Sequence, residues 1–394
     1  MIQFTQLKGE QSPMKEMFLL DPEVIFLNHG SFGATPRPVF ESYQRWQLEL
    51  EKQPVEFLGR RSDVLLDNAR SILADYLGTQ RDNLVFVSNA TTGVNIIARG
   101  LELGAGDEVL ASDHEYGALD RAWRYLSQTS GFRYINRPVS LPIQSAEQWV
   151  EEFWEGVTGQ TRVIFLSHIT SPTAILLPVA EICRRAREAG IQTIIDGAHA
   201  PGQIDLALDD LGADFYTGNL HKWLCAPKGA AFLYARPEVQ RLAQPLIISW
   251  GWESDNPGPS PFVDWHQWTG TRDISAYLAV PDAIKFQADH NWPEVRIRCH
   301  QLAADLRNRV TALTGLEPLY LDSQDWYKQM GTVPLPQTVD ICRVKQQLYD
   351  EYKIEIPLIQ WKDQKLIRFS LQGYNSIEDV LALEDALKEL IREQ

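Results

Sequence analysis

The residues around Lys222 have the clearest chemical potential in this sequence. From Tyr216 to Gly229 the chain reads Y-T-G-N-L-H-K-W-L-C-A-P-K-G, so the lysine follows small and polar residues and precedes Trp223 and Leu224. An ammonium group among such apolar neighbours loses solvation, which lowers its pKa and leaves an amine that can attack an aldehyde. Taken alone, the four residues H-K-W-L also fit a solvated surface lysine. The assignment of Lys222 therefore depends on the segments around it.

A second candidate group lies upstream, where Ile194 to Gly202 reads I-I-D-G-A-H-A-P-G. The apolar pair predicts a buried strand with Asp196 at its carboxyl end. A carboxylate there could keep the ring nitrogen of a pyridine cofactor protonated, and His199 could contact the ring hydroxyl. The alternative is an aspartate that caps the next helix.

A third candidate is the segment from Asn89 to Asn95, N-A-T-T-G-V-N, which follows the strand-like residues L-V-F-V-S. The start of a helix offers free backbone N–H groups and hydroxyls, which together bind phosphate. Thr91 and Thr92 are the candidate ligands. The alternative, a threonine N-cap without a ligand, accounts for only one of the two threonines.

Four short apolar runs predict the strands that would position these segments: 83–88, 108–112, 162–167 and 192–196. The stretch 180–189 predicts a helix that ends at Gly190. Alternation of strands and helices over residues 83–235 favours a mainly parallel sheet covered on both faces. Ligands of such sheets bind beyond the carboxyl ends of the strands.

The pattern changes after residue 243. Residues 244–268 have no clear period and contain Trp250, Trp252, Trp265 and Trp268, which predicts a long ordered loop that shapes a pocket or an interface. Residues 298–314 and 376–393 are helix-like, and 366–371 alternate like a half-buried strand. These elements predict a small α+β domain at the carboxyl end.

Composition restricts the classes of function. The 394 residues are 44% hydrophobic, and 37 Lys and Arg against 52 Asp and Glu give a net charge of -15, which disfavours nucleic acid and anionic membranes as partners. The four cysteines form no C-x-x-C pair, and no H-E-x-x-H motif occurs, so neither a metal site nor a disulfide framework is predicted. Without a signal-like or membrane-spanning stretch, we expect a cytoplasmic protein with reduced thiols.

The order phosphate cradle, Asp196, Lys222 resembles the pyridoxal-phosphate enzymes of aminotransferase class V, which have fold type I. Four further motifs resemble the isopenicillin N epimerase branch of that class: L-L-D-P-E-V-I-F-L-N-H-G-S-F-G from residue 19, D-H-E-Y from 113, S-H-I-T-S-P-T-A-I-L-L-P from 167 and G-T-R-D-I from 270. The resemblance implies a mainly parallel seven-stranded sheet in a large cofactor-binding domain, 18–262. A smaller α+β domain, 263–394, would follow, and residues 1–17 would pack with it.

The resemblance also implies roles for individual residues. Lys222 would form the Schiff base with pyridoxal 5'-phosphate, and Asp196 would pair with the pyridine nitrogen. The implied phosphate contacts are Thr91, Thr92, Asn219 and His221, with Thr271 donated by a second subunit. A homodimer with shared active sites is therefore expected.

Four further positions match family positions and keep alternatives. Tyr116 would stack on the cofactor ring, although His114 could compete for that role. His168 would face the O3′ side of the ring, or it is a core histidine with satisfied hydrogen bonds. Arg368 would bind the substrate α-carboxylate through its planar fork, or it is an outward-facing strand arginine.

The expected reaction is at the α-carbon of an amino acid. Asn28, His29 and Ser31 belong to a loop that in the family lines the substrate entrance. The branch implies an epimerase or racemase, in which Lys222 removes the α-proton and Tyr116 or His114 acts from the other face. Alternatives are cysteine desulfurase-like or C–S lyase β-elimination, a class V aminotransferase, and a non-catalytic binding protein on this fold. Residues 352–364 contain no cysteine, which weakens a desulfurase with a persulfide intermediate.

Overall fold

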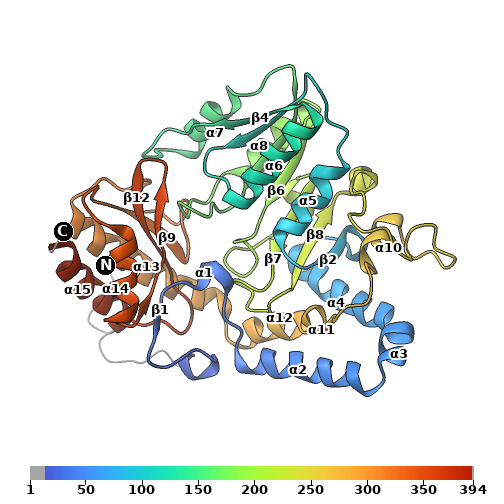
Figure 1. The fold of residues 1–394 in the computed structure, drawn as a ribbon, viewed down its shortest axis with the longest axis horizontal. Helices are drawn as coiled ribbons and strands as arrows, with labels where there is room; N and C mark the ends of the chain where they lie inside the picture. The colour runs from blue at the N-terminus through green and yellow to red at the C-terminus, as the bar shows by residue number, and fades with distance from the viewer. Residues whose placement is uncertain (1–13, 393–394) are drawn as a thin grey trace.

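A seven-stranded, mainly parallel sheet forms the centre of the protein. The computed structural model describes residues 14–392, and Figure 1 shows this sheet beside a smaller one. Along the sheet the strands are β2 (Leu84–Val87), β8 (Ala231–Ala235), β7 (Phe215–Asn219), β6 (Gln192–Asp196), β5 (Thr161–Ser167), β3 (Glu108–Ser112) and β4 (Arg133–Arg137). Strand β8 runs antiparallel to both of its neighbours, and the other pairings are parallel. The predicted α/β fold class is confirmed.

Helices cover both faces of this sheet. In β5, Val163 and Phe165 pack on one face, whereas Ile164 and Leu166 pack on the other. The first face is covered by α5 (Ala90–Gly100), α6 (Gly117–Ser130) and α10 (Pro261–Gln267). The second is covered by α4 (Ser62–Leu77), α7 (Ala146–Trp154), α8 (Val179–Glu188) and α9 (Leu208–Leu211). Burial on both sides explains why these strands are apolar at nearly every position.

The stretch predicted as a loop, 244–268, contains a helix. Helix α10 begins after Ser260, whose Oγ accepts a hydrogen bond from the N–H of Val263 at 3.3 Å, and it has a proline at its first position. A serine cap followed by proline is a strong helix start. Because Phe262 and Val263 are buried in the core, packing stabilises a helix too short for its period to be recognised.

A second, antiparallel sheet consists of β11 (Leu358–Trp361), β12 (Gln364–Ser370) and β9 (Met330–Leu335). Helix α13 (Trp292–Thr314) packs on β9, while α14 (Ile341–Asp350) and α15 (Ile377–Arg392) lie on the side away from the large sheet (Figure 1). The predicted small α+β unit is thus present, with the expected helices and strand at close to the expected bounds. The exact division at residue 262 stays a prediction.

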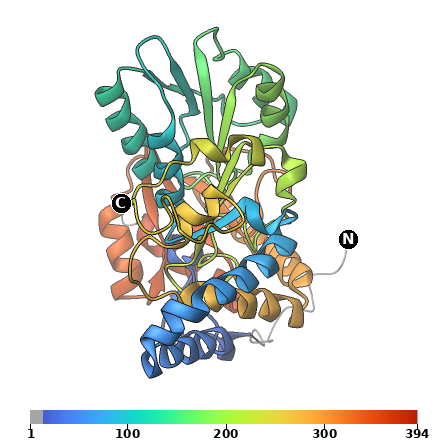
Figure 2. The same ribbon diagram turned by 90° about the vertical axis from the view of Figure 1, so that its right-hand side faces the viewer.

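The remaining elements connect the two sheets. Strand β1 (Ile25–Phe26) pairs in parallel with β10 (Ile354–Glu355), and α1 (His29–Phe32) follows it directly. Helices α11 (Ser275–Leu278) and α12 (Val280–Asp289) pack against α2 (Arg37–Lys52) and α4, below the large sheet in Figures 1 and 2, where α3 (Pro54–Glu56) also lies. Residues 1–13 of the segment expected to pack with the small unit lie outside the described part of the chain.

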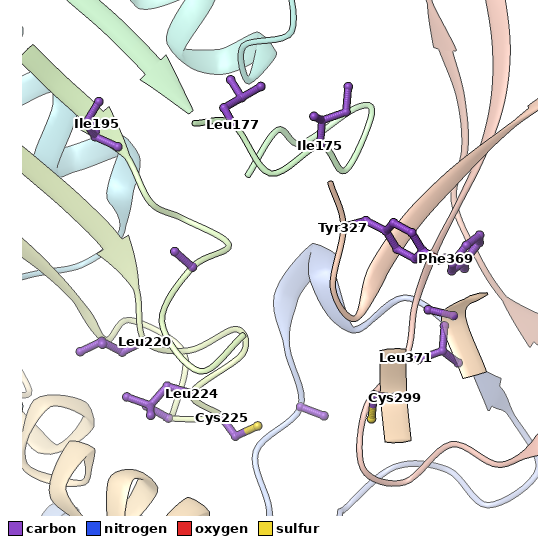
Figure 3. Close-up of a cluster of buried hydrophobic side chains, with 14 of the residues drawn as sticks. Ile175, Leu177, Ile195, Leu220, Leu224, Cys225, Cys299, Tyr327, Phe369 and Leu371 are labelled. Atoms are coloured by element: carbon purple, nitrogen blue, oxygen red, sulfur yellow. The ribbon is translucent and has the colours of Figure 1, made fainter. Parts of the chain in front are cut away.

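One apolar core joins both sheets behind the segment that carries Lys222. Figure 3 shows Ile195 and Leu220, from the large sheet side, in the same cluster as Phe369 and Leu371 from the small sheet side. Leu224 also belongs to this cluster. The backbone around Lys222 is therefore anchored from two directions. Within residues 14–392, no helix combines the length and the apolar character that crossing a membrane would require.

Candidate active site

A cavity of about 620 Å³ opens where the carboxyl ends of the large-sheet strands meet α1 and β12. Its lining combines side chains from α1, from the strand ends of the large sheet and from β12. Ten residues predicted from the sequence line it: Ser31, Thr91, Thr92, Tyr116, Asp196, His199, Asn219, His221, Lys222 and Arg368. The position matches the rule that ligands of parallel sheets bind beyond the carboxyl strand ends.

Lys222 follows β7 and projects its amine into this cavity. Its Nζ lies 3.3 Å from Nε2 of His199. Burial, and then the nearby charge of Arg368, lower the pKa of the Lys222 amine, while Asp196 acts in the opposite direction. The backbone is held closely as well, because a Cβ on Gly33 would lie 2.0 Å from the carbonyl oxygen of His221. Gly33 has φ +71°, so a glycine allows this loop to pass against the Lys222 segment.

Asp196 is the last residue of β6 and is buried in the cavity wall. Its Oδ1 accepts a hydrogen bond from the N–H of Ala198 at 2.9 Å. Burial raises the pKa of the Asp196 carboxyl, and the charge of Lys222 opposes that rise. A buried carboxylate of this kind gains most from a cationic N–H partner.

The predicted phosphate cradle lies at the start of α5. Asn89, not a threonine, is the N-cap: its side chain accepts a hydrogen bond from the N–H of Thr92 at 2.8 Å. Asn219 accepts another from the N–H of Ala90 at 2.9 Å, which ties the helix start to β7. Because capping is done by Asn89 and Asn219, the Thr91 and Thr92 hydroxyls are not needed as caps and line the cavity.

Arg368 in β12 reaches across from the small sheet. The residue is 5% exposed, and its guanidinium donates to the Ser171 carbonyl at 2.6 Å and to the Ser31 hydroxyl at 3.1 Å. Burial lowers its pKa to about 10. Among residues 14–392 no carboxylate pairs with it, and its Nε has no partner. A buried guanidinium of this kind needs an anion, which the α-carboxylate of an amino acid would supply.

Tyr116 precedes α6 and lines the cavity, with 44% of its surface exposed. The residue before it, Glu115, was not singled out from the sequence. Its carboxyl accepts hydrogen bonds from the Ser112 hydroxyl at 2.5 Å and from the Ser167 N–H at 2.8 Å. Burial raises the pKa of Glu115 to about 8. The Glu115 carboxyl therefore links the loop that carries Tyr116 to the end of β5, which lies next to Asp196 in the sheet.

Two predicted histidines lie outside the cavity lining. His168 is buried and hydrogen-bonded through Nδ1 to the Tyr216 hydroxyl at 2.9 Å, the satisfied core arrangement that the sequence left open. His114 bonds through Nδ1 to Thr173 at 2.8 Å and packs on Trp361 at 4.5 Å between ring centroids. Burial lowers the pKa of His114 to about 3. Its ring contacts the small-sheet hairpin, which leaves Tyr116 as the member of D-H-E-Y in the cavity.

Three more predicted residues also lie outside the lining. His29 is fully buried behind Lys222, where Nε2 is 3.0 Å from the Lys222 carbonyl oxygen, so it holds the backbone of the lysine and does not face the entrance. Asn28 donates to Glu355 at 2.9 Å. Thr271 is exposed in a separate groove with Trp250.

Sequence reasoning missed three lining residues at the end of β5 and just after it: Ser167, Ile169 and Ser171. All three fall within the S-H-I-T-S motif, and Ser167 pairs in register with Asp196 on the neighbouring strand. Strand order could have predicted Ser167, because a polar residue that ends the strand next to Asp196 must lie at the same edge of the sheet. No group of His, Cys, Asp and Glu in residues 14–392 could hold a metal ion.

Comparison with known proteins places this arrangement in a family. The model described as "Aminotransferase class-V" matches residues 26–383. The chain belongs to the class-V aminotransferase family. Isopenicillin N epimerase of Amycolatopsis lactamdurans is 37% identical to this class-V protein over 390 residues, covering 95% of this chain and 97% of that protein. The epimerase of Streptomyces clavuligerus is 34% identical over 386 residues, covering 95% and 97%.

The class-V protein is also similar to enzymes of other reactions. A probable chloroplastic L-cysteine desulfhydrase of Arabidopsis thaliana is 27% identical over 418 residues, covering 95% of this chain and 84% of that protein. Among solved structures, a C-DES variant with glycine covalently linked to its PLP cofactor superposes with a TM-score of 0.83 at 21% identity, covering 94% and 97%. At that identity the likeness shows the fold.

The cofactor of this class-V protein is pyridoxal 5'-phosphate. The residues present fit it: a buried lysine amine for the aldehyde, a buried carboxyl with room for a cationic N–H, and threonine hydroxyls at a helix start for the phosphate. Lys222, Asp196, Thr91 and Thr92 would hold the group. Each donor type matches one polar substituent of the cofactor.

Proposed function

We propose that this protein is an amino-acid epimerase or racemase. The observation that carries the proposal is that Lys222, Tyr116 and Arg368 line one cavity, so two groups able to move a proton lie beside one able to bind a carboxylate. The similarity to two isopenicillin N epimerases over nearly the whole chain supports the same reaction.

The chain's own residues account for the steps of such a reaction. Arg368 binds the α-carboxylate of the substrate with the help of Ser31 and Ser171. When bound, the cofactor supplies an electron sink that stabilises negative charge at the α-carbon. Burial lowers the pKa of Lys222, which accepts the α-proton at Nζ. The Tyr116 hydroxyl, which lines the same cavity, donates the proton that returns to the α-carbon.

A β-elimination at a cysteine-type substrate is the second candidate. The 27% identity to a probable L-cysteine desulfhydrase supports it. None of the four cysteines lines the cavity: Cys183, Cys225 and Cys299 are buried elsewhere, and Cys342 is exposed on α14. A persulfide on this chain therefore has no place beside Lys222, so direct release of the sulfur is the form of elimination that the site favours.

We infer that the protein acts as a homodimer. Thr271 is exposed and does not line the cavity of its own chain. It lies in a groove of about 550 Å³ with the exposed side chains of Trp250 and Val55. Exposed large apolar side chains that gather in one groove are typical of an interface. Thr271 would then reach the phosphate site of the partner subunit.

The test combines spectroscopy with product analysis. Purified protein with added pyridoxal phosphate is expected to develop a visible absorption band that Lys222→Ala abolishes and Lys285→Ala, at an exposed ion pair, keeps. L-Amino acids incubated in heavy water are then separated by chirality. Deuterium at the α-carbon with inversion supports the epimerase, whereas pyruvate with sulfide supports β-elimination. Absence of the band in the unsubstituted protein would contradict the cofactor assignment.

A further inference from the structure

Trp223 directly follows Lys222 in the chain, but its side chain points into the core, where it is fully buried. Its indole nitrogen lies 3.2 Å from Nδ1 of His199. The other ring nitrogen of His199, Nε2, lies 3.3 Å from Nζ of Lys222. Three side chains thus form a line of polar contacts from the core to the cavity, which His199 and Lys222 both line.

The direction of these hydrogen bonds follows from the chemistry of the groups. An indole N–H is a donor only, so Nδ1 of His199 must accept and carries no proton. Burial, and the charge of Arg368, lower the pKa of His199, so its imidazole is neutral. A neutral imidazole has one proton. That proton is therefore on Nε2, the nitrogen that faces Lys222.

A donor at Nε2 requires an acceptor at Nζ. A protonated lysine amine has three N–H donors and no lone pair, whereas the unprotonated amine can accept. We propose that Trp223 is a positioning residue that fixes the Nε2–H tautomer of His199, and that His199 thereby holds Lys222 as an unprotonated amine. For its catalytic consequence this inference rests on the proposed function, because the unprotonated amine is the form that attacks an aldehyde and accepts an α-proton.

The indole is held in this orientation by its surroundings. It packs against Ile169, Ala174 and Met330 in a small buried cluster. The carbonyl of Trp223 accepts a hydrogen bond from Gln287 at 2.8 Å. A Cβ on Gly202 would lie 2.3 Å from the Trp223 backbone, so the chain is tightly enclosed there. A rotation of the indole would lose these contacts, and its N–H therefore stays aimed at His199.

Burial already favours the unprotonated form of Lys222, and the charged groups around it act on its pKa without a hydrogen bond to Nζ within residues 14–392. His29 and His221 are neutral near pH 7, because burial lowers their pKa to about 3 and about 4. Arg368 adds to the effect of burial on the Lys222 amine, and Asp196 opposes both. The hydrogen bond from His199 is then the directional contact that distinguishes the two protonation states.

The first test reads the tautomer directly in the cofactor-free protein. Protein labelled with 15N at histidine is examined by NMR, and His199→Gln identifies the signals of His199. We expect a neutral ring with its proton on Nε2. A proton on Nδ1, or on both nitrogens, would overturn the inference whether or not the protein is an epimerase.

The second test removes the donor. Trp223→Phe keeps an aromatic ring without the N–H, and we expect the pH midpoint for capture of pyridoxal phosphate to rise by about one pH unit, so that capture near neutral pH is about tenfold slower. The matched control is Trp292→Phe, since Trp292 is also buried and donates its indole N–H to the Gly202 carbonyl at 3.0 Å. An unchanged midpoint in Trp223→Phe would refute the proposal.

Two variants of His199 cover the case in which Trp223→Phe does not fold. In His199→Gln the amide oxygen can accept from Trp223 and the amide nitrogen can donate to Lys222, so the midpoint is expected to stay low. In His199→Leu both bonds are lost, and the midpoint is expected to rise. Equal midpoints in the two variants would count against the proposal. Failure of the unsubstituted protein to capture pyridoxal phosphate would contradict the proposed function, and the NMR result would still decide the tautomer.

Discussion

Arg368 is a buried cation whose observed partners, within the described chain, are neutral oxygens. The Ser31 hydroxyl and the Ser171 carbonyl orient the guanidinium, and the cavity leaves room for the carboxylate that would neutralise it. Arg368→Lys keeps the charge but loses the two-pronged geometry. We expect KM for the amino-acid substrate to rise about 10- to 100-fold, or about 1.5–3 kcal/mol, with a smaller change in kcat.

The matched control for that change is Arg296→Lys, because Arg296 pairs with exposed Asp205 on the surface. Its kinetic constants are expected to match those of the unsubstituted enzyme. If Arg368→Lys bound the substrate as tightly as the original, the guanidinium would not be the carboxylate anchor.

Glu115 makes stability depend on pH in a direction opposite to most carboxyl groups. Burial raises its pKa to about 8, so the folded protein retains a proton that the unfolded chain releases above pH ~4.5. The folded state thus binds more protons than the unfolded state between about pH 4.5 and 8, and the free energy of unfolding from this group falls as pH rises. Glu115→Gln removes that loss, because its amide oxygen can accept from the Ser167 N–H while its amide nitrogen donates to the Ser112 hydroxyl.

Thermal unfolding of Glu115→Gln and the unsubstituted protein across that range measures the effect. The variant is expected to gain stability relative to the original as pH rises, while contributions of Lys222 and the buried histidines cancel in the difference. Glu152→Gln serves as a control, since hydrogen bonding to Gln148 lowers the pKa of that carboxyl. A difference independent of pH would show that Glu115 is ionised throughout.

At the scale of elements, the phosphate cradle depends on how closely α5 approaches β7. A Cβ on Gly93 would lie 2.3 Å from Oγ1 of Thr217, whose hydroxyl is bonded to the Phe232 carbonyl at 2.7 Å. Gly93→Ala must therefore push the helix start away from the sheet. We expect a loss of about 1–3 kcal/mol in stability and weaker retention of pyridoxal phosphate, measured by thermal unfolding and equilibrium binding.

The comparison variant is Gly104→Ala, because a Cβ there meets nothing within 4 Å. It should leave both quantities unchanged. The double variant Gly93→Ala, Thr217→Ala removes the hydroxyl that clashes and should recover part of the loss. Full stability in Gly93→Ala alone would mean that α5 can shift without cost.

An element could be predicted from the sequence when the interactions that form it are local, and not when they join residues far apart in the chain. The strands before Thr91 and Asp196 have local apolar patterns, so their positions were predicted from the sequence. Strand β7 before Lys222 was not predicted, because it ends in Thr217, Gly218 and Asn219. Histidines gave no such information: His29 and His199 look alike in sequence, yet one holds a backbone carbonyl and the other faces the cavity. Their roles depend on contacts across hundreds of residues, such as that between His29 and Tyr374, which no local pattern encodes.

The pairing of Arg368 with Ser31 and Ser171 was inaccessible for the same reason. The three residues come from β12, α1 and the segment after β5, and only the packing of the small sheet against the large one brings them together. Resemblance to a family predicted a carboxylate-binding role for Arg368, whereas its partners could be identified only from the structure. Glu115 was missed because a carboxyl beside an aromatic residue is unremarkable until its burial is known.

For the whole molecule, the decisive question is whether one chain contains a complete site. Trp250 is 82% exposed and Val55 is 71% exposed, and the groove between them includes Thr271. An unpaired apolar surface of this kind is costly in water, and a second copy would cover it. Trp250→Glu is expected to convert dimer to monomer in sedimentation experiments, whereas Tyr349→Glu, at an exposed aromatic residue of α14, is expected to remain dimeric.

Mixing two defective subunits tests whether the sites are shared. Lys222→Ala lacks the amine and Thr271→Ala lacks the hydroxyl, so each homodimer is defective at both of its sites. If Thr271 acts in the partner's site, a mixed dimer has one site in which Lys222 and Thr271 are both intact. Random mixing then restores about a quarter of the original sites at limiting pyridoxal phosphate, because half of the dimers are mixed and each has one intact site. If Thr271 served its own chain, the intact site would not form, and mixing would restore nothing beyond the sum of the two homodimers.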